Sequence, residues 1–320
     1  MRIAVLDDWA GVALDMADWD SLGAEITVFR ESVTDEAVLA ERLVPFDVVC
    51  LMRERTPMPA SLLRRLPKLE LLVTTGPRNL TIDLEAARAA GVTVCGTESR
   101  KTSTAELAMA LLIVLARGIV PEAASVHRGG WQVGIGRDLE GLILGVLGLG
   151  RVGTRMAELA RAFGMEVIAW SRNLTESHCA EVGVGYRPDL QTLMAESDAV
   201  SIHLVLSDRS RGLVDRHAFG AMKADGMLVN TSRGLIVDTQ ALLAALRSEP
   251  RRRAALDVFD AEPLPAAHPL RDPALLDSGQ LLLTPHLGYV TESTWRLFYT
   301  QTVAAIAAWR AGTPVRVLTG

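Results

Sequence analysis

The sequence predicts an α/β protein made of two doubly wound domains, each built on a parallel sheet. Three observations support this prediction. A glycine-rich turn joins a strand pattern to a helix pattern near residue 148, strand and helix patterns alternate along most of the chain, and the length of 320 residues exceeds the usual size of one core.

The glycine-rich turn predicts a dinucleotide-binding Rossmann unit. Gly148, Gly150 and Gly153 fit G-x-G-x-x-G between the strand pattern that begins at Leu142 and a helix pattern that ends at Gly164. The first glycine permits the tight turn, the second lets the backbone approach a pyrophosphate, and the third lets helix pack on strand. The pyrophosphate would lie on the free N–H groups at the helix N-terminus. With the next strand, Glu166–Trp170, this gives a βαβ unit of about thirty residues.

Residues 1–100 contain alternating strand and helix patterns without a G-x-G-x-x-G turn, so this domain need not bind the nucleotide. We expect a flavodoxin-like fold for it, and its role as the substrate domain is what the family resemblance carried by the motifs of the second domain implies. Its helices are expected at Asp35–Leu43, with Thr34 as the cap, and at Asp83–Ala90. Its strands are expected at Ile3–Leu6, Ile26–Phe29, Val48–Met52, Leu69–Thr74 and Val92–Cys95.

Residues 101–288 form the predicted dinucleotide-binding domain. Thr102–Arg117 reads as an apolar helix that is buried between domains or subunits, or in the core of its own domain. Thr291–Ala311 is expected to return to the first domain, which residues 289–320 then complete. The remaining strands are expected at Ala199–Leu206, Met227–Asn230, Ala254–Phe259 and Leu281–Leu283, with a helix at Thr239–Arg247.

Composition restricts the partners and the compartment. The formal net charge of −5 argues against nucleic acid or an anionic membrane as partner, and the longest apolar stretch is about half a membrane span. The N-terminus lacks the pattern of a signal peptide. Cys50, Cys95 and Cys179 are widely spaced, which predicts reduced structural cysteines, a cytoplasmic protein and no metal site.

Three segments carry polar residues at strand ends of the second domain: Asn230–Gly234, Asp257–Pro263 and Thr284–Gly288. Taken singly, Arg233 reads as a surface residue, Glu262 as a solvated loop acid and His286 as a histidine with an ordinary hydrogen-bond partner. Because doubly wound sheets bind ligands at the carboxyl ends of their strands, the shared placement of the three favours a common site.

These residue types supply what hydride transfer to and from a hydroxyl carbon requires. A histidine suits proton transfer at neutral pH, and a nearby carboxylate stabilises its protonated form and holds its tautomer. An arginine binds a substrate carboxylate through two hydrogen bonds and polarises the adjacent carbonyl.

The chain resembles the D-isomer-specific 2-hydroxyacid dehydrogenase family over nearly its whole length. The motifs that carry the resemblance occur in family order, as Gly148-Leu-Gly-Arg-Val-Gly153, Asn230-Thr-Ser-Arg-Gly234, Ala255-Leu-Asp-Val-Phe259 with Glu262-Pro263, and Thr284-Pro-His-Leu-Gly288. The resemblance implies hydride transfer between NAD or NADP and a small D-2-hydroxy acid or its 2-keto form, such as a glyoxylate-like, hydroxypyruvate-like or phosphoglycerate-like acid.

The resemblance also implies the roles of individual residues. Arg233 would bind the substrate carboxylate, His286 would be the acid/base, Glu262 would pair with it, and Asp257 would hold the nicotinamide carboxamide. Hinges would fall near Arg100 and near residues 287–290, and family members are commonly dimers joined through their cofactor domains. We assign cofactor binding to Thr104, Gly148, Gly150, Arg151, Val152, Gly153, Ser171, Arg172, Thr231, Asp257, His286 and Gly288.

Two departures from the family pattern bear on specificity. Ser171 stands where the family usually has an acid that binds the adenosine ribose, and Arg172 follows it, so we expect NADP rather than NAD. In Thr75-Gly76-Pro77-Arg78, an arginine stands where a glycine is usual. We therefore expect Arg53, Thr75, Gly76 and Arg78, with Arg233 and His286, to contact substrate, and Arg55 to lie beside them.

Two other functions remain as alternatives. One is a formate or phosphite dehydrogenase of the same fold, although no residue marks those substrates. The other is a non-catalytic regulator that senses nucleotides, since fold alone does not fix function. The chain ends at Gly320, about where the substrate domain would close, so we expect no C-terminal regulatory domain.

Overall fold

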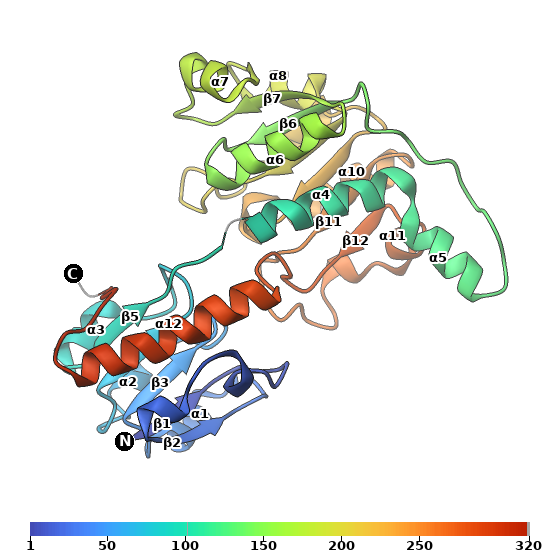
Figure 1. Ribbon diagram of the computed structural model, residues 1–320. Coiled ribbons are helices and arrows are strands. Elements are labelled where there is room, and N and C mark those ends of the chain that lie inside the picture. The colour runs from blue at the N-terminus through green and yellow to red at the C-terminus, as the bar shows by residue number, and fades with distance from the viewer. Residues whose placement is uncertain (101, 319–320) are drawn as a thin grey trace. The chain divides into compact units, whose positions relative to one another are not determined.

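The computed structural model describes residues 1–100 and 102–318 and confirms the α/β fold class (Figure 1). The chain divides into two compact units. Unit 1 comprises Met1–Arg100 with Val290–Gly320, and unit 2 comprises Lys101–Tyr289.

Unit 1 is a five-stranded parallel sheet in the order β2-β1-β3-β4-β5, which is the flavodoxin-like order. Helix α12 (Glu292–Arg310) packs on β4 and β5 and buries Phe298 and Tyr299. The strands are β1 (Arg2–Val5), β2 (Glu25–Val28), β3 (Val48–Leu51), β4 (Leu71–Thr74) and β5 (Thr93–Gly96), and the other α-helices are α1 (Glu36–Leu43), α2 (Ala60–Leu63) and α3 (Leu84–Ala89).

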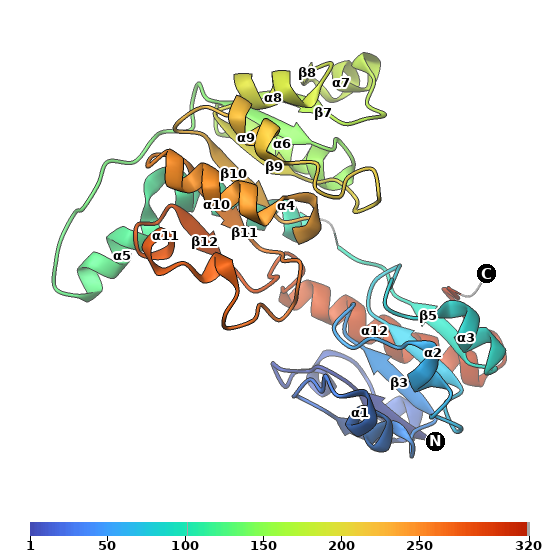
Figure 2. The ribbon, with the colours of Figure 1, turned by 180° about the vertical axis from the view of Figure 1, so that it is seen from behind.

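Unit 2 is a seven-stranded parallel sheet in the order β12-β11-β10-β9-β6-β7-β8, with helices on both faces (Figures 1 and 2). The strand order reverses between β6 and β9, which is where a Rossmann sheet binds its dinucleotide. Its strands are β6 (Ile143–Leu147), β7 (Glu166–Trp170), β8 (Gly185–Tyr186), β9 (Ala199–Ile202), β10 (Met227–Asn230), β11 (Arg253–Leu256) and β12 (Leu281–Leu283). Its α-helices are α4 (Thr102–Arg117), α5 (Ile119–His127), α6 (Arg151–Ala162), α7 (Glu176–Val182), α8 (Leu190–Glu196), α9 (Arg216–Ala221), α10 (Thr239–Ser248) and α11 (Pro273–Asp277).

Some predicted boundaries are wrong, and polar side chains explain why. The cap of α1 is Asp35 rather than Thr34, because the Asp35 carboxylate accepts the N–H groups of Ala37 and Val38. Strand β9 ends at Ile202 rather than Leu206, and the chain then turns at Ser207, whose N–H is accepted by Ser210 Oγ.

Strand β11 likewise ends at Leu256 rather than Phe259. The Phe259 N–H donates a hydrogen bond to the Glu262 carboxylate and not to a neighbouring strand. A side chain of the following loop therefore satisfies this backbone group. The loops after β9 and β11 are therefore longer than the sequence predicts.

Helix α4 belongs to the core of unit 2. It packs against α6, β10 and β11, and it buries Ala108, Met109, Leu112 and Leu115. Of the two expected positions, the core of its own domain is therefore confirmed. Among the described residues, no single helix has the length and apolar character to cross a membrane, and α4 and α5 meet that test only as a pair bent by 65°.

Candidate active site

The glycine turn after β6 has the sterically constrained geometry that its three glycines predict. Gly148 has φ +98°, and a Cβ there would lie 2.9 Å from the His203 carbonyl oxygen. A Cβ at Gly153 would lie 2.0 Å from the Gly148 carbonyl oxygen, so the helix packs on the turn only through glycine. Gly150 has open space around its Cβ position and caps α6 without a side-chain hydrogen bond. Its open surroundings fit an approaching pyrophosphate.

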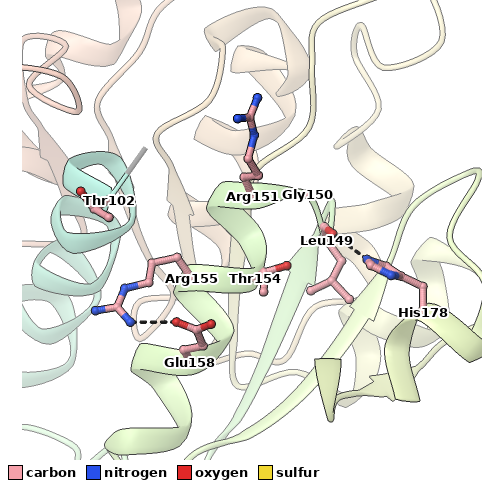
Figure 3. Close-up of a pocket in the computed structure, with 8 residues that line it drawn as sticks. All are labelled: Thr102, Leu149, Gly150, Arg151, Thr154, Arg155, Glu158 and His178. Atoms are coloured by element: carbon pink, nitrogen blue, oxygen red, sulfur yellow. Dashed lines mark hydrogen bonds and ion pairs between the residues drawn. The ribbon is translucent and has the colours of Figure 1, made fainter. Parts of the chain in front are cut away.

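A cavity of about 390 Å³ opens beside this turn (Figure 3). It is bounded by Gly150, by Arg151 and Thr154 on α6, by Thr102 on α4 and by His178 on α7. His178 Nε2 lies 3.3 Å from the Leu149 carbonyl oxygen, an interaction that no pattern in the sequence predicts. Arg151 is exposed at the helix start, whereas the Val152 side chain packs on the core and leaves only its backbone for a ligand.

The segment after β10 orients Arg233 through a buried asparagine. Asn230 is fully buried, its Nδ2 donates to the Arg233 carbonyl, and its Oδ1 accepts the Ser232 N–H. Within the described residues, the buried Thr231 Oγ1 has no hydrogen-bond partner. An unpaired buried hydroxyl costs free energy, so Thr231 Oγ1 is available to bond a polar group of a ligand.

Glu262 and His286 form a close pair. Glu262 Oε2 lies 2.5 Å from His286 Nδ1, and Glu262 Oε1 accepts the Phe259 N–H at 2.9 Å. Burial works to raise the pKa of Glu262, but the hydrogen bond and charge of His286, the Phe259 N–H and the charge of Arg233 together hold this pKa below its usual value. Glu262 is therefore ionised at neutral pH, and His286 Nδ1 donates to it.

Nε2 of the same histidine is available for chemistry, because no residue within 1–100 or 102–318 bonds to it. The ring packs edge-on against Tyr289, with centroids 5.2 Å apart, and the His286 backbone has φ +56°. For a non-glycine residue this left-handed conformation is uncommon and concentrates at functional sites. The loops of the three predicted catalytic residues come together, since the Gly234 Cβ position lies 2.1 Å from the Phe259 carbonyl carbon and the charge of Arg233 helps to lower the pKa of Glu262.

Asp257 holds the loop that carries the histidine. Its Oδ1 accepts hydrogen bonds from the Thr284 hydroxyl at 2.6 Å and from the Leu287 N–H at 2.7 Å. Its Oδ2 accepts a hydrogen bond from the Gly288 N–H at 2.8 Å. Complete burial raises the pKa of Asp257, and these three hydrogen bonds offset part of that effect. Thr104 Oγ1 donates to the Gly288 carbonyl and ties α4 to the same loop.

The predicted substrate residues of unit 1 lie at the carboxyl ends of β3 and β4. Arg53 has φ +54°, and Thr75 Oγ1 accepts its N–H at 2.9 Å. The Arg53 guanidinium lies over Gly76, where a Cβ would approach its Nη1 to 1.8 Å. Arg78 is exposed in the same loop, and Arg55 is half-buried beside Arg53.

Comparison with known proteins agrees with this arrangement. Residues 109–288, more than half of the chain, match the family model described as "D-isomer specific 2-hydroxyacid dehydrogenase, NAD binding domain". The chain belongs to the D-isomer-specific 2-hydroxyacid dehydrogenase family. It is therefore an NAD(P)-dependent oxidoreductase that transfers hydride between its cofactor and a 2-hydroxy or 2-keto acid, as the sequence predicted.

Individual family members show the extent of the likeness. A glyoxylate reductase of Aeropyrum pernix is 39% identical over 73% of this chain and 71% of its own length. A D-3-phosphoglycerate dehydrogenase of Methanocaldococcus jannaschii is 33% identical over 79% of this chain, which spans only 48% of that protein. The crystal structure of a phosphoglycerate oxidoreductase from Vibrio cholerae O395 superposes with a TM-score of 0.90 at 35% identity, covering 98% of this chain and 99% of that chain.

Sequence reasoning about this family member missed one more pair near the site. His268 Nε2 lies 3.0 Å from Asp260 Oδ1, two residues before Glu262. Each residue stands in an irregular segment, so the only available signal was a second histidine and a second acid in the same loop. Among the described residues, no cluster of three or more histidine, cysteine or acidic side chains is arranged to hold a metal.

Proposed function

We propose that this protein reduces small 2-keto acids to D-2-hydroxy acids with NAD(P)H, and catalyses the reverse oxidation, using Arg233, Glu262 and His286. The observation that carries the proposal is the 2.5 Å contact between Glu262 and His286, in loops at the carboxyl end of the sheet that also carries the glycine turn. A relative of matching length, the Aeropyrum pernix protein, is named a glyoxylate reductase. We therefore place glyoxylate-like and hydroxypyruvate-like acids first among its substrates.

The bound nicotinamide supplies the hydride in reduction and accepts it in oxidation. Arg233 binds the substrate carboxylate and polarises the neighbouring carbonyl. His286 donates the proton on Nε2 to the carbonyl oxygen as that oxygen gains charge, and takes it back in the reverse direction. Glu262 keeps the imidazole oriented through Nδ1 and stabilises its protonated form.

The cofactor-binding residues are assigned from the same edge of the sheet. The backbone around Gly150, Arg151 and Val152 would hold the pyrophosphate, and the unpaired hydroxyl of Thr231 would bind a cofactor group. Asp257 accepts a hydrogen bond from the Gly288 N–H, and the Gly288 carbonyl accepts one from Thr104. These three residues would form the part of the site that holds the nicotinamide.

NADPH is the proposed preferred cofactor, with NADH as the alternative. Ser171 follows β7 where a carboxylate would repel a 2′-phosphate, and Arg172 is exposed next to it. A charge-assisted hydrogen bond contributes about 1.5–3 kcal/mol, or roughly one to two orders of magnitude in affinity. A wild-type enzyme that uses NADH with the higher kcat/KM would contradict this preference.

Substrate selection is assigned to the edge of unit 1. Arg53 hydrogen-bonds to Thr75 through its N–H and its guanidinium, which also lies over Gly76, and Arg78 is exposed in the same loop. These arginines favour an acid with a second negative charge, which keeps a phosphoglycerate-like substrate as the second candidate. Arg78→Ala should raise KM more for a phosphorylated acid than for glyoxylate, and Arg88→Ala, an exposed arginine on α3, is the control. Equal effects of Arg78→Ala on both acids would remove Arg78 from substrate selection.

A panel of 2-keto acids, phosphorylated and not, assayed by nicotinamide absorbance with both reduced cofactors, tests the proposed function. Formate and phosphite belong in the same panel with the oxidised cofactors. Turnover of a 2-keto acid supports the proposal, turnover of formate or phosphite alone would replace it, and tight nucleotide binding without turnover would favour the non-catalytic regulator.

We also propose a homodimer in the cytoplasm. Helix α5 and the segment that follows it project from the sheet of unit 2 and expose apolar side chains, including Trp131 at 73% and Ile135 at 96% (Figure 1). Glu122 accepts the N–H groups of Val133 and Gly134, so this segment is ordered while its apolar side chains face outward. A second copy would cover them. The cytoplasmic location rests on the three free, buried cysteines.

A Trp131→Ser/Ile135→Ser double variant tests the dimer by sedimentation. The proposal predicts a dimer for the wild type and a monomer for the variant. A monomeric wild type would contradict it.

A further inference from the structure

A second arginine lies beside Arg172 on a different loop of unit 2. Strands β7 and β9 flank β6 on its two sides, and the loops after them bracket the glycine turn. Gly148 N–H donates to the Trp170 carbonyl at the end of β7, and the Gly148 Cβ position lies against the His203 carbonyl after β9. Arg209 stands in the loop after β9, and Arg172 in the loop after β7.

The loop that carries Arg209 is built as a closed turn. Ser210 Oγ donates to the Val205 carbonyl at 2.7 Å and accepts the Ser207 N–H at 2.8 Å, and the Arg211 N–H donates to the Ser207 carbonyl. Arg209 is therefore presented from an ordered backbone, although its side chain is exposed.

Reciprocal hydrogen bonds join the two loops. Arg172 Nε donates to the Arg209 carbonyl at 3.2 Å, and Arg209 Nη2 donates to Asn173 Oδ1 at 3.1 Å. Each arginine thus reaches into the loop of the other, which places two guanidinium groups in one small region.

Neither guanidinium has a carboxylate partner among residues 1–100 and 102–318, since both bond to neutral oxygens. The other charged residues of the two loops and of the first turn of α7 are Arg211, Asp208 and Glu176. The region therefore carries a net positive charge, and two cations held together in this way are stabilised by an anion that binds both.

We propose that Arg209 and Arg172 together bind the 2′-phosphate of NADP, with Arg209 as a cofactor-specificity residue contributed by the loop after β9. This inference rests on the proposed NADPH preference and adds Arg209 to the residues proposed to bind the 2′-phosphate. The ribose of a dinucleotide lies at the end of the second strand of a Rossmann sheet, which is β7 here, so a phosphate on its 2′ oxygen would face the Arg172 loop. Arg209 offers a second planar set of N–H donors to the same group.

The test compares two probes that differ only in the 2′-phosphate, adenosine 2′,5′-bisphosphate and adenosine 5′-monophosphate. Their affinities for the full-length chain are measured by calorimetry for the wild type, Arg209→Ala, Arg172→Ala and the double variant. Arg211→Ala is the matched control, because Arg211 lies in the same loop as Arg209. Among the described residues, its side chain bonds to neither Arg172 nor Arg209.

We expect Arg209→Ala to weaken binding of the bisphosphate by roughly 10-fold to 100-fold, the affinity equivalent of a charge-assisted hydrogen bond. Binding of the monophosphate should be unchanged, and Arg211→Ala should change neither. The double variant should lose less than the sum of the two single losses in free energy, because both residues bind one group. Arg209→Lys should recover part of the affinity.

Two outcomes would overturn the inference while leaving the proposed function in place. If Arg172→Ala weakens bisphosphate binding and Arg209→Ala does not, the preference for NADPH rests on Arg172 alone. If Arg209→Ala weakens binding of both probes equally, Arg209 only maintains the loop. Equal wild-type affinity for the two probes would overturn both the inference and the NADPH preference, whereas 2-keto acid reduction is measured separately.

Discussion

Two histidine–carboxylate pairs lie in neighbouring loops of unit 2, and they differ in what surrounds them. His286 pairs with Glu262 at 2.5 Å, and His268 pairs with Asp260 at 3.0 Å. The two acids are separated by one residue, so the same short segment supplies the carboxylate of each pair.

The two pairs differ in what the second ring nitrogen of the histidine bonds to. His268 Nδ1 accepts the Leu270 N–H and caps a short helix at Pro269–Arg271, so both nitrogens of His268 serve the loop. His286 uses only Nδ1 within the described residues and holds a left-handed backbone. A histidine–carboxylate contact therefore indicates proton transfer only where the other nitrogen is available to substrate.

Alanine at each histidine gives the largest expected contrast. His286→Ala should lower kcat by roughly 10²–10⁴-fold with little change in cofactor affinity, because it removes the proton donor. His268→Ala should lower kcat by less than about tenfold and mainly reduce the free energy of unfolding, because a lost cap or hydrogen bond costs on the order of 1 kcal/mol. Steady-state kinetics and urea unfolding measure the two effects, and equal losses of kcat would erase the distinction between the pairs.

Gly234 allows the loop of Arg233 to approach the backbone of the loop that carries Glu262. A Cβ at Gly234 would lie 2.1 Å from the Phe259 carbonyl carbon, so alanine must separate the loops of Arg233 and Glu262. Displacement of about 1 Å can cost on the order of 10²-fold in rate, and we expect that loss in kcat/KM for Gly234→Ala.

Gly220→Ala is the matched control for that substitution. Gly220 lies in α9 with nothing within 4 Å of its Cβ position. Alanine there should leave kcat/KM unchanged and stabilise the protein by about 0.5–1 kcal/mol. Wild-type kcat/KM in Gly234→Ala would show that the two loops do not need their close approach.

A smaller effect is expected in the pH dependence of stability. Because the pKa of Glu262 lies below its usual value in the folded protein, its ionised form stabilises the fold above the unfolded pKa of 4.5, and this contribution is lost as pH falls through the folded pKa. The wild type should exceed Glu262→Gln in unfolding free energy at pH 7, and this difference should shrink as pH falls through the folded pKa of Glu262. In the His286→Ala background the difference at pH 7 should be smaller, and an unchanged difference there would contradict the pairing.

The sequence predicted the framework and the principal residues because these depend on local rules. The glycine spacing dictated the turn after β6, and the polar strand ends indicated Arg233, Glu262 and His286, since parallel strands present their carboxyl ends at one edge. The family motifs added the order of these segments.

The remaining features depend on contacts between irregular loops, which no local period encodes. The bond between Arg209 and Asn173 joins residues 36 positions apart, and the Asp257 carboxylate binds a loop 30 positions further along. The predicted strands that end at Leu206 and Phe259 are also too long. Apolar residues continue beyond each strand into a loop, where backbone N–H groups bond to side chains.

The pH dependence of keto-acid reduction tests most directly whether the pair of His286 and Glu262 transfers the proton. Reduction requires the protonated imidazole, so kcat/KM falls as pH rises and the pair loses its proton. Glu262→Gln removes the carboxylate that stabilises this proton, and its loss of rate should begin at a lower pH than in the wild type. Asp260→Asn, at the neighbouring pair, should leave the profile in place. A Glu262→Gln profile that coincides with the wild type, or an equal displacement in Asp260→Asn, would contradict the account.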